Sequence, residues 1–458
     1  MRLGLLFFGL MLGVLGAVER PNFLFVIADD CTHRDWGCYG GQAKTPNIDR
    51  LATEGMRFTR CFQAAPMCSP TRHNIYTGLY PVTSGAYPNH TFAKAGTKSV
   101  CHYLGDLGYR VALSGKKHIA PREVFPFEYS GKGNNPDLVA VDALMAESKA
   151  AGKPFCLFAC SNEPHSPWNK GDASAYDAAT LELPPYFVDT PETRESMAKY
   201  LAEITYYDQQ VGDLVGLLKK HGIEENTVVV VVSEQGSAFA FAKWTCYDMG
   251  LQSAMVARWP GKVKAGSVTG AMVEYVDLLP TFIDAAGGEV PGVLQGRSFL
   301  PVLRGEAAEH KAYVFGEMTT RGIINGSETF GIRSVRDQKF KYIWNFTPGI
   351  EFTNACTKSK EFQSWVKKAE AGDADAAEKV RRYTWRAGEE LYAVGDGDWY
   401  EWNNLAEDPA YAEIKARLRG ELEAWMELCG DRGQATEAAA KEHQGGGKRK
   451  KKRAKPSA

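Results

Sequence analysis

Four short, largely apolar runs set the main constraint on how this chain can fold. They lie at Pro21–Ile27, Tyr109–Ser114, Pro154–Cys160 and Thr227–Val232, and the last run contains five consecutive valines. Apolar runs of this length are typical of strands that are buried on both faces of a sheet. A long helical pattern over Pro191–His221 precedes the last run. We therefore predict an α/β fold, in which a large mixed β-sheet is sandwiched between helices.

The length of the chain indicates more than one domain. At 458 residues it exceeds what a single ordinary core holds, and from about residue 305 the pattern changes to short strands followed by helices. We expect a large α/β domain over residues 18–305 and a small C-terminal α+β domain over residues 306–432. Residues 433–458 are expected to form a disordered tail, because three glycines there precede a basic block at 448–453. Weak binding of that block to anionic glycan, nucleic acid or membrane is the alternative.

The first residues predict export. Arg2 precedes an apolar run at Leu3–Leu15, and small residues follow up to Ala17, which is the order of a signal peptide at residues 1–17. No later apolar run is long enough to span a bilayer. We therefore expect an exported protein, periplasmic or secreted. Its ten cysteines could form disulfides there, and because no Cys-x-x-Cys pair occurs we predict no structural zinc site.

Two adjacent carboxylates follow the first predicted strand. Asp29 and Asp30 stand just beyond the run that ends at Ile27, and the carboxyl ends of strands in open α/β sheets are where ligands bind. Repulsion between neighbouring carboxylates is costly unless a cation is present, and oxygen ligands favour calcium or magnesium. A solvated Asp-Asp turn is the structural alternative.

A cysteine stands where a loop turns into a predicted helix. In the segment Pro66–Gly78, Cys68 is followed by a helix-compatible Pro70, and Arg72 lies one turn beyond the cysteine. Helix N-termini and guanidinium groups both favour anions such as phosphate or sulfate. The sequence therefore predicts an anion site at Cys68 and Arg72. A buried structural cysteine before a helix is the alternative.

Residues 68–78 resemble the signature of the formylglycine-dependent sulfatases, Cys-x-Pro-x-Arg followed by Thr-Gly. That family belongs to the alkaline phosphatase superfamily, so the resemblance implies an alkaline phosphatase-like sheet. It also implies that a formylglycine-generating maturase oxidises Cys68 to formylglycine (3-oxoalanine), whose hydrate is the nucleophile. The resemblance is nearest to the heparan N-sulfatases and the bacterial polysaccharide sulfatases.

Three further segments that follow predicted strands resemble sulfatase elements. Gly115–His118 matches Gly-Lys-x-His, and Pro164–Pro167 matches Pro-His-x-Pro. Ser233–Gly236 stands where most sulfatases carry Asp followed by His or Asn, and here each side chain has one extra methylene. Carboxylate and amide oxygens are preserved, so calcium ligation remains chemically reasonable.

The resemblance implies a role for each of these side chains. Arg72 and His118 would orient and activate the hydrate. Lys116 and Lys243 would neutralise sulfate oxygens, and His165 would protonate the leaving oxygen. The ligands of a calcium ion, with magnesium as the less favoured ion, would be Asp29, Asp30, Cys68, Glu234 and Gln235.

The substrate implied by the resemblance is a sulfated carbohydrate. Pro121–Tyr129 and Leu183–Pro191 are similar to heparan N-sulfatase segments. Ser233–Gly236 and Lys243–Asp248 are more similar to bacterial enzymes that desulfate algal polysaccharides such as ulvan or fucoidan. We expect hydrolysis of an O-sulfate of a polysaccharide or oligosaccharide, glycosaminoglycans included, with N-sulfoglucosamine hydrolysis (a sulfamidase) as the alternative. Candidate sugar contacts are Arg122, Trp168, Trp244 and Tyr247.

Two proteins of other kinds fit parts of the pattern. A phosphatase or phosphodiesterase of the same superfamily would use an unmodified nucleophile and usually two zinc ions, and nine histidines, few of them at predicted strand ends, argue against it. A catalytically silent protein that binds sulfated glycans would keep the basic pocket but lose the nucleophile or the acid, and here both are present. No nucleic-acid partner and no membrane span are expected.

Overall fold

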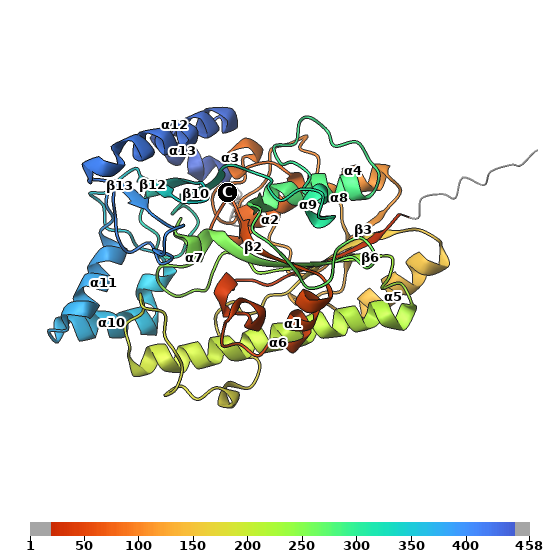
Figure 1. Ribbon diagram of the computed structural model, residues 1–458, viewed down its shortest axis with the longest axis horizontal. Helices are drawn as coiled ribbons and strands as arrows, with labels where there is room; N and C mark the ends of the chain where they lie inside the picture. The colour runs from red at the N-terminus through yellow and green to blue at the C-terminus, as the bar shows by residue number, and fades with distance from the viewer. Residues whose placement is uncertain (1–19, 445–458) are drawn as a thin grey trace, which may run out of the picture.

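The computed structural model describes residues 20–444 and contains a large mixed sheet between two helix layers, with a smaller antiparallel sheet beside it (Figure 1). The large sheet has nine strands in the order β4-β3-β5-β1-β6-β7-β2-β8, and β9 pairs with β2. These strands are β1 Asn22–Ile27, β2 Met56–Phe62, β3 Arg110–Gly115, β4 Glu128–Ser130, β5 Phe155–Cys160, β6 Thr227–Val232, β7 Gln252–Arg258, β8 Ser267–Thr269 and β9 Val273–Glu274. The predicted α/β sandwich is confirmed, and the predicted signal peptide lies outside the described residues.

Four neighbouring strands of the large sheet run parallel and end at the same edge. β1 pairs in parallel with both β5 and β6, and β5 also pairs in parallel with β3. In this register Ile27 lies opposite both Cys160 and Val232, and Gly115 also lies opposite Cys160. The residues that follow these four strands therefore leave the sheet next to one another.

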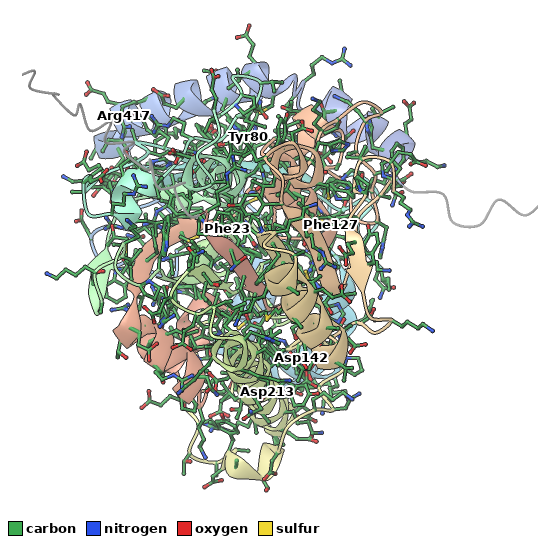
Figure 2. All side chains as sticks on the ribbon, turned by 90° about the vertical axis from the view of Figure 1, so that its right-hand side faces the viewer. Phe23, Tyr80, Phe127, Asp142, Asp213 and Arg417 are labelled. Carbon is green, nitrogen blue, oxygen red and sulfur yellow. The ribbon has the colours of Figure 1, made fainter. Side chains whose placement is uncertain are left out.

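Helices cover both faces of the sheet because both faces are apolar. The helices of the large unit are α1 Pro46–Glu54, α2 Cys68–Thr77, α3 Pro81–Ser84, α4 Val100–Asp106, α5 Leu138–Ala150, α6 Pro191–His221, α7 Asp248–Leu251, α8 Leu278–Ala285 and α9 Leu300–Leu303. Leu24 of β1 belongs to the core cluster under α1, α5 and α6, whereas its neighbour Phe23 belongs to the cluster under α2, α4 and α8, as the two-residue period of a strand requires. Figure 2 shows Asp142 on α5 and Asp213 on α6 in the helix layer at the bottom of the view.

The longest helix, α6, has its end signals in the local sequence. The side chain of its N-cap, Thr190, accepts a hydrogen bond from the backbone N–H of Thr193, Pro191 occupies the first turn, and Gly222 ends the helix with a φ of 61°. The helix spans Pro191–His221, which are the bounds predicted from the sequence.

The C-terminal part of the chain forms an antiparallel sheet of four strands in the order β10-β11-β12-β13. Its elements are β10 Val314–Thr319, β11 Gly331–Arg336, β12 Lys341–Asn345, α10 Lys360–Glu370, α11 Ala374–Thr384, β13 Glu389–Tyr392, α12 Ala412–Cys429 and α13 Gln434–Ala439. Helix α12 covers one face, where Leu418, Leu422 and Trp425 join Val335 and Tyr342 in one apolar cluster. The predicted α+β unit is confirmed, and its boundary at residue 305 stays a prediction.

The prediction that a disordered tail begins at residue 433 is wrong for the first part of that segment. Residues 434–443 form α13 and a short 3-10 helix, Ala440–His443. Glu437 on α13 is buried and pairs at 2.9 Å with the guanidinium of the buried Arg333, which also pairs with Asp431. A buried arginine needs anionic partners, and that long-range requirement is invisible in local composition. The basic block at 448–453 lies outside the described residues.

All ten cysteines lie within the described residues, and none of them forms a disulfide. Eight of the ten are buried, where a free cysteine packs as a small apolar side chain. Within residues 20–444, no helix is long and apolar enough to cross a membrane.

Candidate active site

The edge of the large sheet where β1, β3, β5 and β6 end carries the ten side chains predicted for the site. Seven of the ten are buried, and the other three, Lys116, His118 and His165, are partly exposed. The structure thus brings together side chains from six places in the chain: the β1 end (Asp29, Asp30), the β3 end (Lys116, His118), the β5 end (His165), the β6 end (Glu234, Gln235), the loop before α7 (Lys243) and α2 (Cys68, Arg72).

The two adjacent carboxylates are fully buried and each is matched to a lysine. Asp29 pairs with Lys116, and Asp30 pairs with Lys243 at 2.6 Å. The amide nitrogen of Gln235 donates to Asp29 at 3.1 Å and to Asp30 at 2.7 Å. Burial acts to raise the pKa of Asp30, but attraction from Lys243 and other neighbouring donors outweighs it and lowers that pKa below its usual value. Asp30 is therefore anionic at neutral pH.

The pKa values of the two lysines are shifted in opposite directions. Burial lowers the pKa of Lys116 to about 7. Attraction from Glu234 opposes this decrease, and repulsion from Lys243 adds to it. Burial also acts to lower the pKa of Lys243, but Asp30 and Cys68 raise it above its usual value. Lys243 is therefore cationic, and Lys116 titrates near neutral pH. Both ammonium groups stand where they could meet the oxygens of an anion.

Helix α2 begins at Cys68 and carries Arg72 one turn later, as predicted. Arg72 is completely buried; its Nη2 pairs with Glu234 Oε2 at 2.9 Å, and its Nη1 donates to the backbone carbonyl of Lys116 at 3.3 Å. Burial raises the pKa of the Cys68 thiol to about 11, and the opposing effect of Lys243 is smaller. An unmodified thiol at this position would stay protonated at neutral pH and would be a poor nucleophile.

Cys68, His118 and His90 are connected by two successive side-chain contacts. His118 Nδ1 is 3.1 Å from Cys68 Sγ, and His118 Nε2 is 2.9 Å from His90 Nδ1. Burial, followed by repulsion from Lys116 and His90, lowers the pKa of His118 to about 2, so its imidazole is neutral. Sequence reasoning missed His90, because it stands in an irregular loop with no motif around it. Only the fold brings it to His118.

His165 stands at the open side of the site. Its Nε2 is 3.6 Å from Asp30 Oδ2, and its side chain is 34% exposed. Asp30 acts to raise the pKa of His165, but burial and repulsion from Lys243 and Lys116 outweigh this, and the pKa falls to about 4. An anion placed against the two lysines would weaken that repulsion and raise the pKa again.

The acidic floor of the site offers oxygen atoms that the protein itself leaves without donors. Glu234 Oε1 and Gln235 Oε1 are buried and have no hydrogen-bond partner among residues 20–444. A buried acceptor without a donor is costly, and a cation that prefers oxygen ligands would satisfy it. In the same range no three His, Cys, Asp or Glu side chains are spaced to hold a metal ion, and lysine ammonium groups pair with the two aspartates. The donor chemistry fits calcium or magnesium.

The backbone is strained at residues that follow the ends of the strands, next to the site. Asp30, His118 and Gln235 have left-handed φ values of 60°, 49° and 37°, a conformation that costs about 1 kcal/mol or more for residues other than glycine. Gly115, with a φ of 94°, ends β3, and an added Cβ there would lie 2.0 Å from the carbonyl oxygen of Cys160. These strained residues all belong to the site or border it, and strain of this kind gathers at functional sites.

A cleft of about 980 Å³ opens onto this floor. Trp168 and Trp244, both predicted sugar contacts, line it, whereas Arg122 and Tyr247 do not. Tyr247 is buried, and its hydroxyl donates to Glu390 of the C-terminal unit at 3.0 Å. The sugar-contact prediction is therefore wrong for Tyr247 and has no support for Arg122. The predicted site residues that line the cleft are Asp30, Cys68, Lys116, His118, His165 and Lys243.

The edge of the parallel strands gathers a cysteine, an arginine, two lysines and two histidines over buried carboxylates. This set of side chains suits a hydrolase that cleaves esters of oxyacids such as sulfuric acid. The chain belongs to the sulfatase family, whose profile matches residues 21–288. It is a sulfuric ester hydrolase. A second profile, described as N-sulphoglucosamine sulphohydrolase, C-terminal, matches residues 236–381.

Relatives of known activity place the chain within this family. An ulvan-active sulfatase of Formosa agariphila is 34% identical over 90% of this chain and 81% of that protein. The N-sulphoglucosamine sulphohydrolase of Homo sapiens is 29% identical over 91% of this chain and 92% of that protein. A solved structure described as a complex with its substrate D-glucosamine-2-N,6-O-disulfate has a TM-score of 0.68 at 22% identity, covering 91% of this chain and 99% of that chain. The family predicted from the motifs is confirmed.

Proposed function

We propose that this enzyme hydrolyses sulfate esters of a sulfated carbohydrate, with formylglycine formed at Cys68 as the nucleophile and a calcium ion beside it. Overall, water and the ester R–O–SO3⁻ give the alcohol R–OH and hydrogen sulfate. The main support is the setting of Cys68, which begins α2, lies 3.1 Å from a neutral imidazole nitrogen and faces an open cleft that contains Lys116 and Lys243.

The chemical state of residue 68 decides whether the site can react. A thiol whose pKa is raised to about 11 presents almost no thiolate at neutral pH. Formylglycine requires a separate maturase that oxidises the thiol to an aldehyde, and the aldehyde hydrate supplies a hydroxyl group at the same position.

The other side chains bind and orient the sulfate. Lys116 and Lys243 neutralise its oxygens. Arg72, fixed by its pair with Glu234, holds residue 68 in place together with His118. His165 donates a proton to the leaving oxygen, since a bound sulfate would raise its pKa by offsetting the repulsion of the lysines.

We also propose that the acidic floor holds a divalent cation, calcium in preference to magnesium, because an all-oxygen set of three carboxylates and an amide suits the larger ion. When bound, that cation would polarise the sulfate and the nucleophile. The two lysines would then turn from the aspartates toward the sulfate. Support comes from the buried oxygens that lack donors. The ligands would be Asp29, Asp30, Glu234 and Gln235, together with residue 68.

Removal of the metal tests this part directly. Chelation should lower both the melting temperature and sulfate release, because a bound cation would stabilise the folded state and polarise the sulfate, and added calcium should restore both. Calorimetry and a sulfate assay on the same sample measure the two effects. A protein that is indifferent to the chelator in both measurements would contradict the calcium site.

The relatives support a carbohydrate substrate. One is named for activity on ulvan and another for N-sulphoglucosamine, and Trp168 and Trp244 in the cleft suit the faces of sugar rings. We favour an O-sulfate ester. Removal of an N-sulfate from glucosamine is the second candidate, favoured by the match of residues 236–381 to the C-terminal profile of N-sulphoglucosamine sulphohydrolases. Because residues 1–17 have the order of a signal peptide, we propose that the enzyme acts outside the cytoplasm.

Sulfate release tests the function. The full chain is exported from a host with a competent maturase and offered ulvan oligosaccharides, N-sulfated heparan oligosaccharides and 4-nitrophenyl sulfate. Wild type should release sulfate and Cys68→Ala should not, while keeping its fold, because a small side chain at this position packs much as cysteine does. Undiminished release by Cys68→Ala, or no release by a wild type that carries formylglycine, would overturn the proposal.

A further inference from the structure

The cleft carries more positive charge than one sulfate group requires. Lys116 and Lys243 stand at its floor, and among the described residues that line it only Asp30 and Glu361 are acidic. Asp30 is already paired with Lys243. A concave surface with an excess of one charge attracts ligands of the opposite charge. Four more lysines line the cleft: Lys117, Lys132, Lys199 and Lys360.

These four lysines differ in whether their charges are paired with carboxylates. Lys199 and Lys360 share the carboxylate of Glu195, at 2.5 Å and 3.1 Å. Lys117 and Lys132, which follow β3 and β4, are exposed and form no ion pair with any residue of the described range. The Nζ of Lys117 lies 4.4 Å from the centroid of an aromatic ring, that of Tyr129. Because β3 and β4 pair in parallel, with Ser114 opposite Ser130, the two lysines leave neighbouring strand ends. The part of the lining that they form, the Lys117–Lys132 wall, carries positive charge without an ion-pair partner among the described residues.

We propose that the Lys117–Lys132 wall is a second anion site, which binds a sulfate or carboxylate on a sugar unit next to the one that is desulfated. This site presupposes the proposed function and narrows its substrate to a polyanionic oligosaccharide or polysaccharide. A single exposed lysine contributes little, but two that line one concave surface act on the same ligand.

The test compares one polyanionic probe with one probe that carries a single sulfate. Binding of a heparin hexasaccharide is titrated by fluorescence at low and at high salt, and turnover of 4-nitrophenyl sulfate is measured in parallel. The double variant Lys117→Ala/Lys132→Ala should bind the hexasaccharide about tenfold more weakly at low salt, with a smaller loss at high salt. Its kcat/KM for 4-nitrophenyl sulfate should stay within about twofold of wild type.

Lys98→Ala is the matched control, because Lys98 also lies over a tyrosine ring, at 6.0 Å from that of Tyr103, and is not part of the cleft lining. This variant should change neither the affinity for the hexasaccharide nor the turnover of 4-nitrophenyl sulfate. Equal hexasaccharide affinity in the double variant and wild type would overturn the second anion site. The proposed function would still be supported in that case if wild type turns over 4-nitrophenyl sulfate. Loss of binding in the double variant would support the site even if 4-nitrophenyl sulfate were not turned over.

A separate observation concerns the second ring nitrogen of His118. In a neutral imidazole one nitrogen is protonated and the other is not, so the partner of Nε2 decides the state of Nδ1. We infer that His90 is a positioning residue: its Nδ1 accepts a hydrogen bond from His118 Nε2–H across the 2.9 Å contact. His118 Nδ1, which faces residue 68 at 3.1 Å, is then free to accept a proton from the nucleophile of the proposed reaction.

Variants of His90 must tolerate its left-handed φ of 56°, and Gly and Asn both do. His90→Gly removes the acceptor nitrogen, whereas His90→Asn places an amide oxygen near the position that this nitrogen occupied. Loss of the acceptor should lower kcat about tenfold with KM within about twofold, and His90→Asn should recover most of kcat. A His90→Gly enzyme with the kcat of wild type, or a His90→Asn enzyme as slow as His90→Gly, would overturn the role.

A spectroscopic readout keeps this test independent of turnover. Nitrogen-15 NMR of histidine-labelled protein reports the tautomer of each imidazole, and the signals of His118 are assigned by their loss in His118→Gln. Wild type and His90→Asn should show His118 protonated at Nε2, and His90→Gly should show a mixture of tautomers. The same tautomer of His118 in all three proteins would overturn the inference.

Discussion

At the scale of single residues, the site depends most on the buried pair of Arg72 and Glu234. Both side chains are completely buried, with Nη2 and Oε2 at 2.9 Å. Arg72 also donates to the carbonyl of Lys116, so it connects α2 with the end of β3. Removal of one partner from such a pair costs more than the pair itself contributes, because the other charge is left buried and unmatched.

Arg72→Met should therefore lower the free energy of unfolding by about 3 kcal/mol and abolish sulfate release. Denaturant titration followed by circular dichroism measures the first effect. Arg50→Met is the control, because Arg50 and Glu54 form an exposed pair at 3.8 Å whose loss should cost less than about 1 kcal/mol. Equal costs for the two variants would contradict the importance of the buried pair.

Contiguous motifs made most site residues predictable, because each motif fixes a turn at the end of a strand together with the side chain it presents. His90 was not predictable, since its contact with His118 depends on how the loop before α4 folds over the cleft. Tyr247 was predicted as a sugar contact because aromatic faces suit carbohydrate, but its side chain is buried and its hydroxyl donates to Glu390. Residue type alone does not tell which aromatic side chains face the cleft and which are buried.

At the scale of elements, helices and strands with local end signals were predictable to the residue. Pro191–His221 and Thr227–Val232 have the predicted bounds, because a proline, a capping threonine and a glycine mark the first and a run of valines marks the second. The order of the strands was not predictable in the same way. β6 lies beside β1 although most of the large unit separates them in sequence, and only packing of both faces decides such pairings.

Helix α6 offers two glycines that test how tightly it packs. Gly216→Ala should raise the free energy of unfolding by about 1 kcal/mol, because no atom lies within 4 Å of an added Cβ. Gly212→Ala should lower it, because an added Cβ would lie 2.6 Å from the side chain of Asn47, whose Nδ2 donates to Asp208 at 2.8 Å. Thermal unfolding of both variants measures the difference, and a stabilised Gly212→Ala would contradict the close approach of α1 to α6.

At the scale of the whole molecule, the C-terminal sheet supports the helix that presents Cys68. Glu317 on β10 accepts a hydrogen bond from the N–H of Val82 in α3 at 2.9 Å, and its own N–H donates to the carbonyl of Ala64, just before α2, at 2.8 Å. Figure 1 shows α2, α3 and β10 near one another in the upper half of the view. Chain segments on both sides of α2 are therefore fixed by one buried residue of the second sheet.

This contact should make stability depend on pH. Burial raises the pKa of Glu317 from its usual 4.5 to about 8, although Arg333 opposes the rise. Between these two values the folded protein holds a proton that the unfolded chain has lost, so this group's contribution to stability falls as pH rises through that window. Glu317→Gln should remove the part of the stability loss that comes from the titration of this carboxyl group. Melting temperatures of both proteins from about pH 5 to about pH 8 test this, and identical pH dependence would contradict the raised pKa.

The central claim is that residue 68 acts as formylglycine, and the mass of one peptide tests it most directly. Trypsin cleaves after Arg60 and Arg72, so residues 61–72 leave the protein as a single peptide that contains Cys68. Protein exported from a host with a competent maturase should yield this peptide with a mass about 18 Da below that of the cysteine form. An unmodified thiol at Cys68 under these conditions would contradict the account.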